Sequence, residues 1–345
     1  MSVEAKIKAL EPGFDELTQA IIDAGRIALS GHTDPDGDAL GSVLALALFI
    51  QKTWPHKQVD VLLANKRPVP RIYAFLPEAG SFINAADYSF DPDLFIALDT
   101  PTLERLRDSA EVLERASMTA AIDHHATSMP FTRVYCCEPG AASTADIVYE
   151  YIRYFGAPLD ADIATCLLCA VITDTGRFQY QNANAHAYAL ASACVTAGAQ
   201  ASYICTQVYQ NDTLASLQLK AATLQRLTVN ADHTVSWSYV THDDLVQYGA
   251  TDEDCEGLID EIRVLGGVDA CVFMREKHSG EIRANLRSKV DWLDVAAVAQ
   301  QFNGGGHKAA AGFTCYLPMA EACETVVRAI EAQIAKQKPK DNALG

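Results

Sequence analysis

Short apolar runs alternate with longer helical segments in the first third of the chain. Four runs have the length and composition of buried strands, and they cover residues 26–30, 59–63, 94–98 and 118–122. Between the first two, the segment 39–54 has a helical pattern after an Asp-Gly-Asp loop. Such alternation is typical of a parallel sheet covered on both faces. We therefore expect an α/β fold with a doubly wound, mainly parallel sheet in this part of the chain.

The pattern changes twice further along the chain. Helical periodicity dominates residues 142–227, where Asp174 and Gly176 interrupt one long apolar helix. Strand-like alternation follows at 234–240, 270–274 and 281–286. These changes predict a second, smaller α/β domain. The expected boundaries are 1–195 for the first domain, 196–225 for a helical linker, 226–338 for the second domain and 339–345 for a tail.

The composition supports two globular domains. A chain of 345 residues is long for one core, since domains average roughly 150 residues. Hydrophobic residues make up 49% and charged residues 21%, which are ordinary values for a globular protein. Disorder of the whole chain is therefore not expected.

The net charge indicates which kind of nucleic acid can be a partner. A formal charge of −17 argues against a surface that follows long nucleic acid, because such binding needs many Lys and Arg contacts to phosphate. A short phosphorylated substrate stays compatible with an acidic chain, because bound cations can invert the local field. We therefore expect short rather than long nucleic acid as a partner.

The cysteines and the apolar stretches indicate the cellular compartment in which the protein is expected. The ten cysteines show no disulfide framework, and Cys166 and Cys169 lie in an apolar run where buried thiols are expected. Residues 1–10 lack the apolar core of a secretory signal. The longest apolar stretch, 42–50, is too short for a bilayer, which takes about 20 helical residues. A cytoplasmic protein without a membrane partner is expected.

Acidic and histidine residues follow the predicted strands and supply the candidate chemistry. They are His32, Asp36 and Asp38 after the first strand, Asp99 after a later one, Asp123, His124 and His125 after the next, and Asp174 in the helical region. The carboxyl ends of parallel strands share one edge of a sheet, so these residues can converge. Carboxylates gathered there would repel one another unless cations neutralised them. Two divalent ions sharing one carboxylate would use such a set, and Asp99 is the candidate for the shared ligand.

Each motif also has an ordinary structural interpretation. Asp-Pro-Asp-Gly alone is usually a turn and helix cap, Asp-His-His a surface loop, and Asp-Thr-Gly a weak signal shared with aspartic proteases. Oxygen-rich sites with one or two imidazoles suit Mn²⁺ or Mg²⁺ better than thiolate-bound zinc. The combination of the motifs in this order favours a metal site over coincidence.

The motifs together resemble those of a known family. They are His-Thr-Asp-Pro-Asp-Gly-Asp-Ala-Leu-Gly-Ser at 32–42, Asp99, Asp-His-His at 123–125, Asp-Thr-Gly at 174–176, Arg-Ser-Lys at 287–289 and Gly-Gly-Gly-His at 304–307. In combination they resemble the DHH phosphoesterase superfamily, in the branch with a C-terminal DHH-associated domain. Bacterial nanoRNases that also act as pAp phosphatases are similar in architecture and length. The resemblance covers nearly the whole chain.

The resemblance implies roles for the first-domain residues. One Mn²⁺ would be held by His32, Asp36 and Asp99, and the other by Asp38, Asp99, His124 and Asp174. His125 would touch the scissile phosphate, while Asp123 would orient an imidazole without binding a cation itself. The expected cofactors are two Mn²⁺ ions, with Mg²⁺ as the alternative.

The resemblance also implies an active-site cleft between the two domains, in which the second domain carries the expected substrate contacts. Gly304, Gly305 and Gly306 would let backbone amides approach a phosphate, and His307 would stand beside them as a donor. Arg287 would grip a phosphate with two hydrogen bonds, and Ser288 would add a hydroxyl. A glycine run on its own is more often a flexible loop, and the resemblance reverses that judgement.

The resulting hypothesis is metal-assisted hydrolysis at phosphorus. The expected substrates are short oligoribonucleotides, cleaved to mononucleotides, and 3′-phosphoadenosine 5′-phosphate (pAp), cleaved to AMP. A phosphoanhydride hydrolase acting on pyrophosphate or short polyphosphate stays open, as does a cyclic di-AMP phosphodiesterase. A non-catalytic nucleotide sensor and a processive single-strand exonuclease are weaker alternatives. A homodimer is expected from the resemblance alone.

Overall fold

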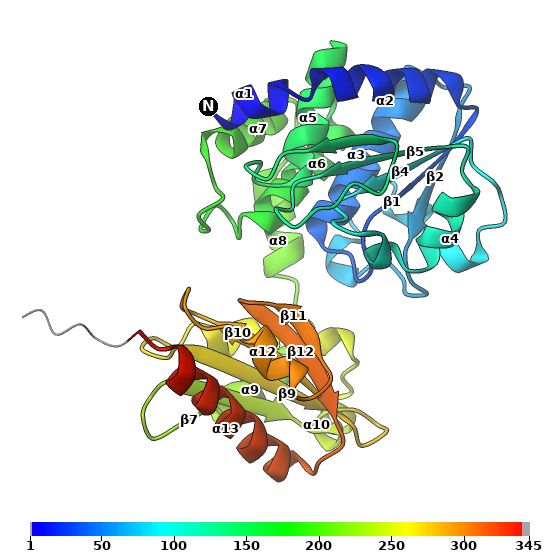
Figure 1. The fold of residues 1–345 in the computed structure, drawn as a ribbon. Coiled ribbons are helices and arrows are strands. Elements are labelled where there is room, and N and C mark those ends of the chain that lie inside the picture. The colour runs from blue at the N-terminus through cyan, green and yellow to red at the C-terminus, as the bar shows by residue number, and fades with distance from the viewer. Residues whose placement is uncertain (1, 340–345) are drawn as a thin grey trace, which may run out of the picture. The chain divides into compact units, whose positions relative to one another are not determined.

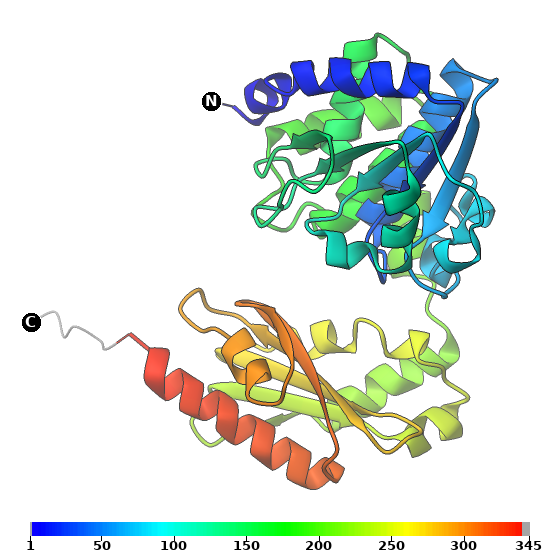
Figure 2. The same cartoon turned by 45° about the vertical axis from the view of Figure 1, so that its right-hand side comes forward.

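A computed structural model describes residues 2–339, apart from the side chain of His307 (Figure 1). The chain divides into two compact units, Met1–Asn211 and Asp212–Gly345. Each unit has its own six-stranded sheet and its own cores. The turned view shows a separate sheet with its helices in each unit (Figure 2). The last residues of the predicted tail, 340–345, lie outside the described part.

The first unit is built on a parallel sheet with the strand order β3-β2-β1-β4-β5-β6. Every neighbouring pair in it is parallel. The strands are β1 (Arg26–Ser30), β2 (Gln58–Leu63), β3 (Ile83–Asn84), β4 (Leu94–Leu98), β5 (Met118–Asp123) and β6 (Val134–Cys137). The helices are α1 (Val3–Lys8), α2 (Glu11–Asp23), α3 (Gly37–Thr53), α4 (Asp108–Arg115), α5 (Thr144–Phe155), α6 (Ala161–Asp174), α7 (Ala185–Thr196) and α8 (Ala201–Tyr209).

Alternate residues of the strands face two different cores. Ile27 and Leu29 of β1 join the larger core, which also contains buried residues of α2, α3, α5 and α6. Ala28, between them, faces a smaller core with Val112 and Leu113 of α4. Apolar side chains on both faces explain why these strands are almost continuously hydrophobic. The expected doubly wound sheet is confirmed.

Helices α3 and α6 pack unusually closely because α3 carries two glycines on the contact. A Cβ atom at Gly41 would lie 2.5 Å from the carbonyl oxygen of Cys166. A Cβ atom at Gly37 would lie 2.4 Å from Oγ1 of Thr173. Only glycine fits such contacts. The first turn of α3 therefore lies against the last turn of α6.

The second unit contains a mixed sheet with the order β11-β12-β10-β9-β8-β7. Its strands are β7 (Thr228–Val229), β8 (Val235–Val240), β9 (Ala270–Glu276), β10 (Ile282–Ser288), β11 (Gly305–His307) and β12 (Ala310–Cys315). The helices are α9 (Leu214–Gln225), α10 (His242–Tyr248), α11 (Leu258–Arg263), α12 (Ala296–Gln300) and α13 (Met319–Gln337). One face packs on α12 and α13, and the other packs on α9, α10 and α11.

The segment predicted as a helical linker, 196–225, contains α8 and α9, which belong to different units. Ile204 of α8 is buried in the core of the first unit, whereas Leu219 of α9 is buried in a core of the second. The division between the units falls at Asn211 and Asp212. Helical periodicity alone does not show on which core an apolar stripe packs, so this division was not visible in the pattern.

The cysteines and the helix lengths bear on the redox state and on membrane spans. Within the described residues all ten cysteines are free thiols, and Cys166 and Cys169 are fully buried in α6. No helix in residues 2–339 is both long and apolar enough to cross a membrane.

Candidate metal centre

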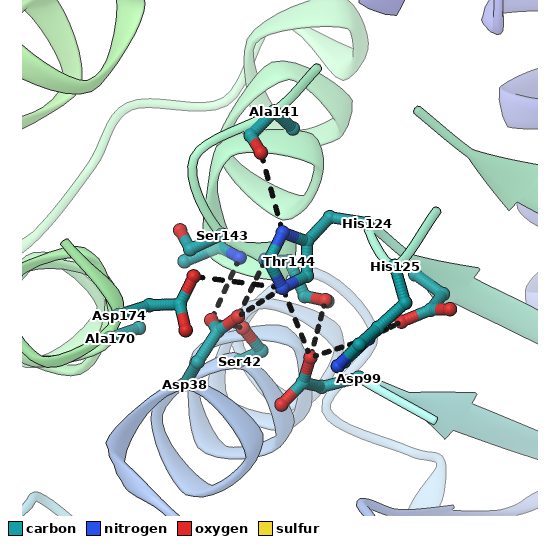
Figure 3. Close-up of polar contacts among 12 residues, drawn as sticks. Asp38, Ser42, Asp99, His124, His125, Ala141, Ser143, Thr144, Ala170 and Asp174 are labelled. Atoms are coloured by element: carbon teal, nitrogen blue, oxygen red, sulfur yellow. Dashed lines mark hydrogen bonds and ion pairs between the residues drawn. The ribbon is translucent and has the colours of Figure 1, made fainter. Parts of the chain in front are cut away.

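The candidate residues of the first unit meet at the carboxyl end of its sheet. His32 follows β1, Asp99 follows β4 and Asp123 ends β5. The strand order runs in opposite directions from β1 and from β4, so a ligand site is expected between these two strands. Asp38 starts α3 and Asp174 ends α6, and the close contact of these helices brings both carboxylates to the same place (Figure 3).

His124 faces three carboxylates. Its Nε2 lies 3.7 Å from Oδ2 of Asp38, 3.6 Å from Oδ1 of Asp99 and 3.6 Å from Oδ2 of Asp174 (Figure 3). Its Nδ1 lies 3.3 Å from the carbonyl oxygen of Ala141, so Nδ1 carries the proton and Nε2 presents its lone pair. The three carboxylate oxygens lie at nearly equal distances from Nε2 of His124. Together with this nitrogen they form four donors that are suited to surround one cation.

His32 faces a second carboxylate group. Its Nε2 lies 3.4 Å from Oδ2 of Asp99 and 3.9 Å from Oδ1 of Asp36. Asp36 is exposed and is also the N-cap of α3, where Oδ1 accepts from the backbone amides of Asp38 and Ala39. The ordinary helix-cap interpretation of this motif is therefore correct, and the cap lies within reach of a metal site as well.

Asp99 belongs to both groups. Oδ1 faces His124, whereas Oδ2 faces His32. The residue has a φ of 53°, a left-handed conformation that is strained for a side chain other than glycine. Its backbone amide donates to Ile122 at 3.0 Å, and its Oδ1 accepts from Oγ1 of Thr144 at 3.1 Å. This arrangement is the one that a shared ligand between two cations requires.

The start of α5 holds Asp38 in place. The backbone amides of Thr144 and Ala145 donate to its two oxygens at 2.7 and 3.2 Å, and the hydroxyl of Ser42 donates at 2.9 Å. A capping box between Ser143 and Asp146 fixes this end of the helix. These residues of α5 were not predicted from the sequence. The Ser-x-x-Asp pattern at 143–146 was the available signal for the helix start.

His125 and Asp123 form a separate pair beside the two groups. Nδ1 of His125 donates to Oδ1 of Asp123 at 2.8 Å and lies 3.6 Å from Oδ1 of Asp99. Asp123 is fully buried. This hydrogen bond fixes the ring, so Nε2 is on the edge that Asp123 does not occupy.

The end of α6 has strained backbone next to Asp174. Gly176, Arg177 and Phe178 have φ values of 55°, 62° and 61°, so three successive residues are left-handed. Asn182 donates to the backbone carbonyl of Asp174 at 3.1 Å and to its Oδ2 at 3.4 Å. Strain that is retained beside a candidate ligand is a common feature of functional sites.

The pKa shifts show what crowding does to these carboxylates. Burial raises the pKa of Asp38 well above its usual value, and repulsion from Asp99 and Asp174 adds to the effect. Burial likewise raises the pKa of Asp174 to about 7, although His124 opposes the shift. Burial alone would lower the pKa of His32, but Asp99 and Asp36 outweigh it and raise that pKa to about 9. Without a cation, protons would have to neutralise the cluster.

The donor set fits divalent cations. Three groups of donors have ligand atoms within 4.8 Å of one another, namely His32, Asp36 and Asp99; Asp38, His124 and Asp174; and Asp99, His124 and His125. Carboxylate oxygens with one imidazole in each of the first two groups suit Mn²⁺ or Mg²⁺. Every metal ligand expected from the sequence lies in one of these groups.

The second unit separates its candidate residues. Arg287 and Ser288 are neighbours in β10 and therefore point to opposite faces. Ser288 is buried, and its hydroxyl donates to the carbonyl of Val290 at 2.7 Å. The hydroxyl of Ser288 therefore lies on the opposite face of the sheet from Arg287. It is not placed to bind the same phosphate as Arg287, as the sequence-based expectation required.

The glycine run forms an edge strand rather than a loop. Gly304 and Gly306 pack so closely on β12 that a Cβ atom would lie 2.4 Å from the carbonyl oxygen of Gly312 and 2.5 Å from that of Ala310. Nothing lies within 4 Å of a Cβ atom at Gly305. Gly305 pairs with Gly312 in β12, which pairs in turn with Asn285 in β10, so Gly305 shares a face with Arg287. The backbone of His307 is in β11, and its side chain lies outside the described part.

Each unit contains a match to a known family model. A family model described as "DHH family, N-terminal domain" matches residues 26–171, and the DHHA1 domain model matches residues 235–336. A curated relative from Thermus thermophilus, "Bifunctional oligoribonuclease and PAP phosphatase NrnA", is 26% identical over 342 residues, which cover 95% of this chain and 98% of the relative.

Solved structures show the same fold. An "exopolyphosphatase-related protein" from Bacteroides fragilis aligns with a TM-score of 0.88 and 26% identity over 95% of this chain and 98% of that protein. "Exonuclease RecJ bound to manganese" aligns with a TM-score of 0.50 and 14% identity over 96% of this chain and 95% of that one. The second similarity concerns the fold alone.

Proposed function

Because the chain belongs to the DHH family and carries a C-terminal DHHA1 domain, we propose that it is a phosphoesterase that hydrolyses short oligoribonucleotides to mononucleotides and pAp to AMP. The similarity to the Thermus thermophilus relative, over nearly the full length of both chains, supports this substrate class. The acidic net charge of −17 is consistent with short rather than long nucleic acid.

The position of Asp99 carries the proposal. Its two oxygens face His124 and His32 separately, as a ligand shared by two cations must. We assign His32, Asp36 and Asp99 to one Mn²⁺ and Asp38, Asp99, His124 and Asp174 to the other, with Mg²⁺ as the alternative. Bound cations would supply Lewis-acid stabilisation of the phosphoryl oxygens and would lower the pKa of a bound water toward neutrality.

The protein residues have distinct tasks in this proposal. The amides at the start of α5 hold Asp38 on its side of the centre. Asp123 fixes Nδ1 of His125, so that Nε2 can contact the scissile phosphoryl group. Arg287 and the backbone at Gly305, on one face of the second sheet, would bind a further phosphate of the substrate, together with His307. The interdomain cleft, the cytoplasmic location and the homodimer stay predictions.

A phosphoanhydride hydrolase is the second candidate. The similarity to an exopolyphosphatase-related protein from Bacteroides fragilis favours it. The same metal geometry would serve either reaction, because both break a bond at phosphorus. Only the substrate differs, so turnover must decide.

The deciding experiment is a substrate panel assayed with Mn²⁺. It contains pAp, labelled di- to pentaribonucleotides, cyclic di-AMP, pyrophosphate and tripolyphosphate. We expect AMP from pAp and mononucleotides from the short RNAs. Asp99→Asn should lower both rates at least about 100-fold, because it weakens both cation sites at once. The control is Asp91→Asn, which makes the same change at an exposed aspartate near the opposite end of β4.

The outcomes separate the two candidates. Turnover of pyrophosphate or tripolyphosphate without turnover of any nucleotide would move the protein to the phosphoanhydride class. A folded Asp99→Asn protein with the activity of the Asp91→Asn control would remove Asp99 from the shared position.

A further inference from the structure

We propose that Arg105 is a substrate-binding residue that holds a phosphate oxygen of the nucleotide beside the metal centre. This inference rests on the proposed phosphoesterase function. None of the sequence motifs contains Arg105, and it follows from the hydrogen-bonding chemistry around His32.

The backbone of Arg105 is attached to the loop that carries His32. Arg105 lies in the 3₁₀ helix η4 (Leu103–Leu106), a few residues after Asp99. Its carbonyl oxygen accepts from the backbone amide of Thr33 at 2.8 Å, and its own amide donates to Thr102 at 3.1 Å. The position of Arg105 beside the metal ligands is therefore fixed by the fold.

The guanidinium of Arg105 contacts an imidazole nitrogen that cannot accept from it while the other nitrogen of the ring binds a cation. Nη2 lies 3.1 Å from Nδ1 of His32, and the same Nδ1 lies 2.8 Å from the carbonyl oxygen of Thr33. A carbonyl only accepts and a guanidinium only donates, so one ring nitrogen cannot satisfy both. If Nε2 of His32 is to ligate a cation, Nδ1 must carry the proton and donate to Thr33.

The guanidinium then faces an N–H group and needs another acceptor. A protonated His32 would leave the same conflict, because both ring nitrogens would carry hydrogen. The remaining tautomer would accept from Arg105, but its Nε2 would carry the proton and could not bind metal. Metal binding therefore frees Arg105 at the centre where a substrate phosphate must arrive.

The surroundings of Arg105 provide no competing carboxylate. Several other arginines of the first unit pair with aspartates, for example Arg26 with Asp60 and Arg115 with Asp91. Among the ion pairs within residues 2–339, none includes Arg105, and its side chain is exposed. An exposed guanidinium matches a phosphate in charge and in planar geometry, so a phosphate oxygen is the acceptor that this position suits.

The test uses Arg105→Ala, Arg105→Lys and the matched control Arg107→Ala. Arg107 is exposed, lies two residues further along and carries the same charge. Three quantities are measured: KM and kcat for pAp, the Kd for AMP by calorimetry with Mn²⁺ present, and the Mn²⁺ affinity of the free protein by electron paramagnetic resonance. We expect Arg105→Ala to raise KM and the AMP Kd about 10- to 100-fold. Arg105→Lys should recover part of the loss, and Arg107→Ala should match the wild type.

The Mn²⁺ affinity distinguishes substrate binding from support of His32. It should change less than about twofold in Arg105→Ala, because no ligand is removed. If KM and the AMP Kd match those of Arg107→Ala, Arg105 does not bind the substrate. If Mn²⁺ affinity falls together with AMP affinity, Arg105 acts through His32 and the proposal is wrong.

Failure of the proposed phosphoesterase function can be distinguished from failure of the proposal for Arg105. If the wild type turns over no nucleotide, the comparison of AMP and inorganic phosphate binding between wild type and Arg105→Ala still decides the role of Arg105. A wild type that binds neither AMP nor phosphate would overturn both proposals.

Discussion

Asp123 shows how one residue can serve the site without touching a cation. One of its oxygens accepts from His125, and the other finds no hydrogen-bond partner among residues 2–339. A buried carboxylate oxygen without a partner costs stability. A carboxylate retained at this cost is consistent with a role in orienting His125.

Asp123→Asn tests this role with little change of shape. The amide can present an N–H to the ring nitrogen that now donates, so His125 loses its fixed orientation. We expect kcat for pAp to fall about 10- to 100-fold while the Mn²⁺ affinity stays within about threefold. Steady-state kinetics and a Mn²⁺ titration measure the two effects. An unchanged kcat in a folded variant would show that His125 does not depend on Asp123.

At the residue scale, the sequence predicted the candidate donors that the structure brings together, but not the groups that hold them. His32, Asp99 and His124 were recognisable because each occurs in a short polar motif after an apolar strand. The amide of Thr144 reaches Asp38 across 106 positions of the chain. Backbone amides carry no signal of residue type, so only tertiary structure reveals such a partner. The contact between Arg105 and His32 was missed for the same reason.

At the element scale, the contact between α3 and α6 determines how close Asp38 and Asp174 can come. Both carboxylates lie at the ends of these helices, and Nε2 of His124 is within 3.7 Å of each. Gly37 and Gly41 allow the approach because neither has a side chain to separate the helices. The glycines therefore shape the candidate metal site, although neither is one of its donors.

Gly41→Ala should lower both the stability of the first unit and its affinity for Mn²⁺, although Gly41 is not one of the candidate donors. Alanine favours a helix by about 0.5–1 kcal/mol over glycine, but overpacking costs about 1–3 kcal/mol. Its Cβ atom would lie 2.5 Å from the oxygen of Cys166 and 3.1 Å from Cβ of Ala170, so the helices must move apart. We expect a net loss of about 1 kcal/mol in the free energy of unfolding, measured with urea, and a weaker Mn²⁺ affinity.

Gly80→Ala is the matched control for this prediction. Nothing lies within 4 Å of a Cβ atom there, and the residue is in the same unit. We expect its unfolding midpoint and its Mn²⁺ affinity to match those of the wild type. A Gly41→Ala protein that behaves like Gly80→Ala would show that the helices accommodate the methyl group without moving.

The elements were predictable where their apolar pattern was long. The strands expected at 26–30 and 94–98 are observed with these bounds as β1 and β4. Strand β3 covers only two residues, which is too short for periodicity to detect. Strand β11 was missed because glycine has low strand propensity, and its pairing with β12 depends on tertiary contact.

At the scale of the whole molecule, the candidate donors belong to one unit only. Among the residues that the structure describes, all the candidate metal groups lie within the first unit, while β9 and β10 contribute to the cores of the second unit. A ligand that binds only the folded form stabilises it by an amount set by its concentration relative to Kd. Cation binding should therefore stabilise the first unit directly.

Hydrogen exchange of the metal-depleted protein, with and without Mn²⁺, measures this effect. We expect amide exchange to slow at least about tenfold in α3, α5 and α6, because repulsion among the carboxylates is relieved. Exchange in β9 and β10 should change less than about twofold. Equal slowing in both sheets would contradict the prediction, and Ca²⁺ in place of Mn²⁺ would show how far the effect depends on charge alone.

The spread of the donors along the chain has a consequence for biosynthesis. His32 is made early, whereas Asp174 is the last residue of α6, and ribosomes add about 5–20 residues per second. A nascent chain that ends before α6 contains the His32, Asp36 and Asp99 group but not the donor that completes the second group. If cations bind as proposed, the growing polypeptide stays without a complete dinuclear centre for roughly ten seconds after His32 is made. The enzyme would then mature only when translation has passed α6, and not while its first strands are being synthesised.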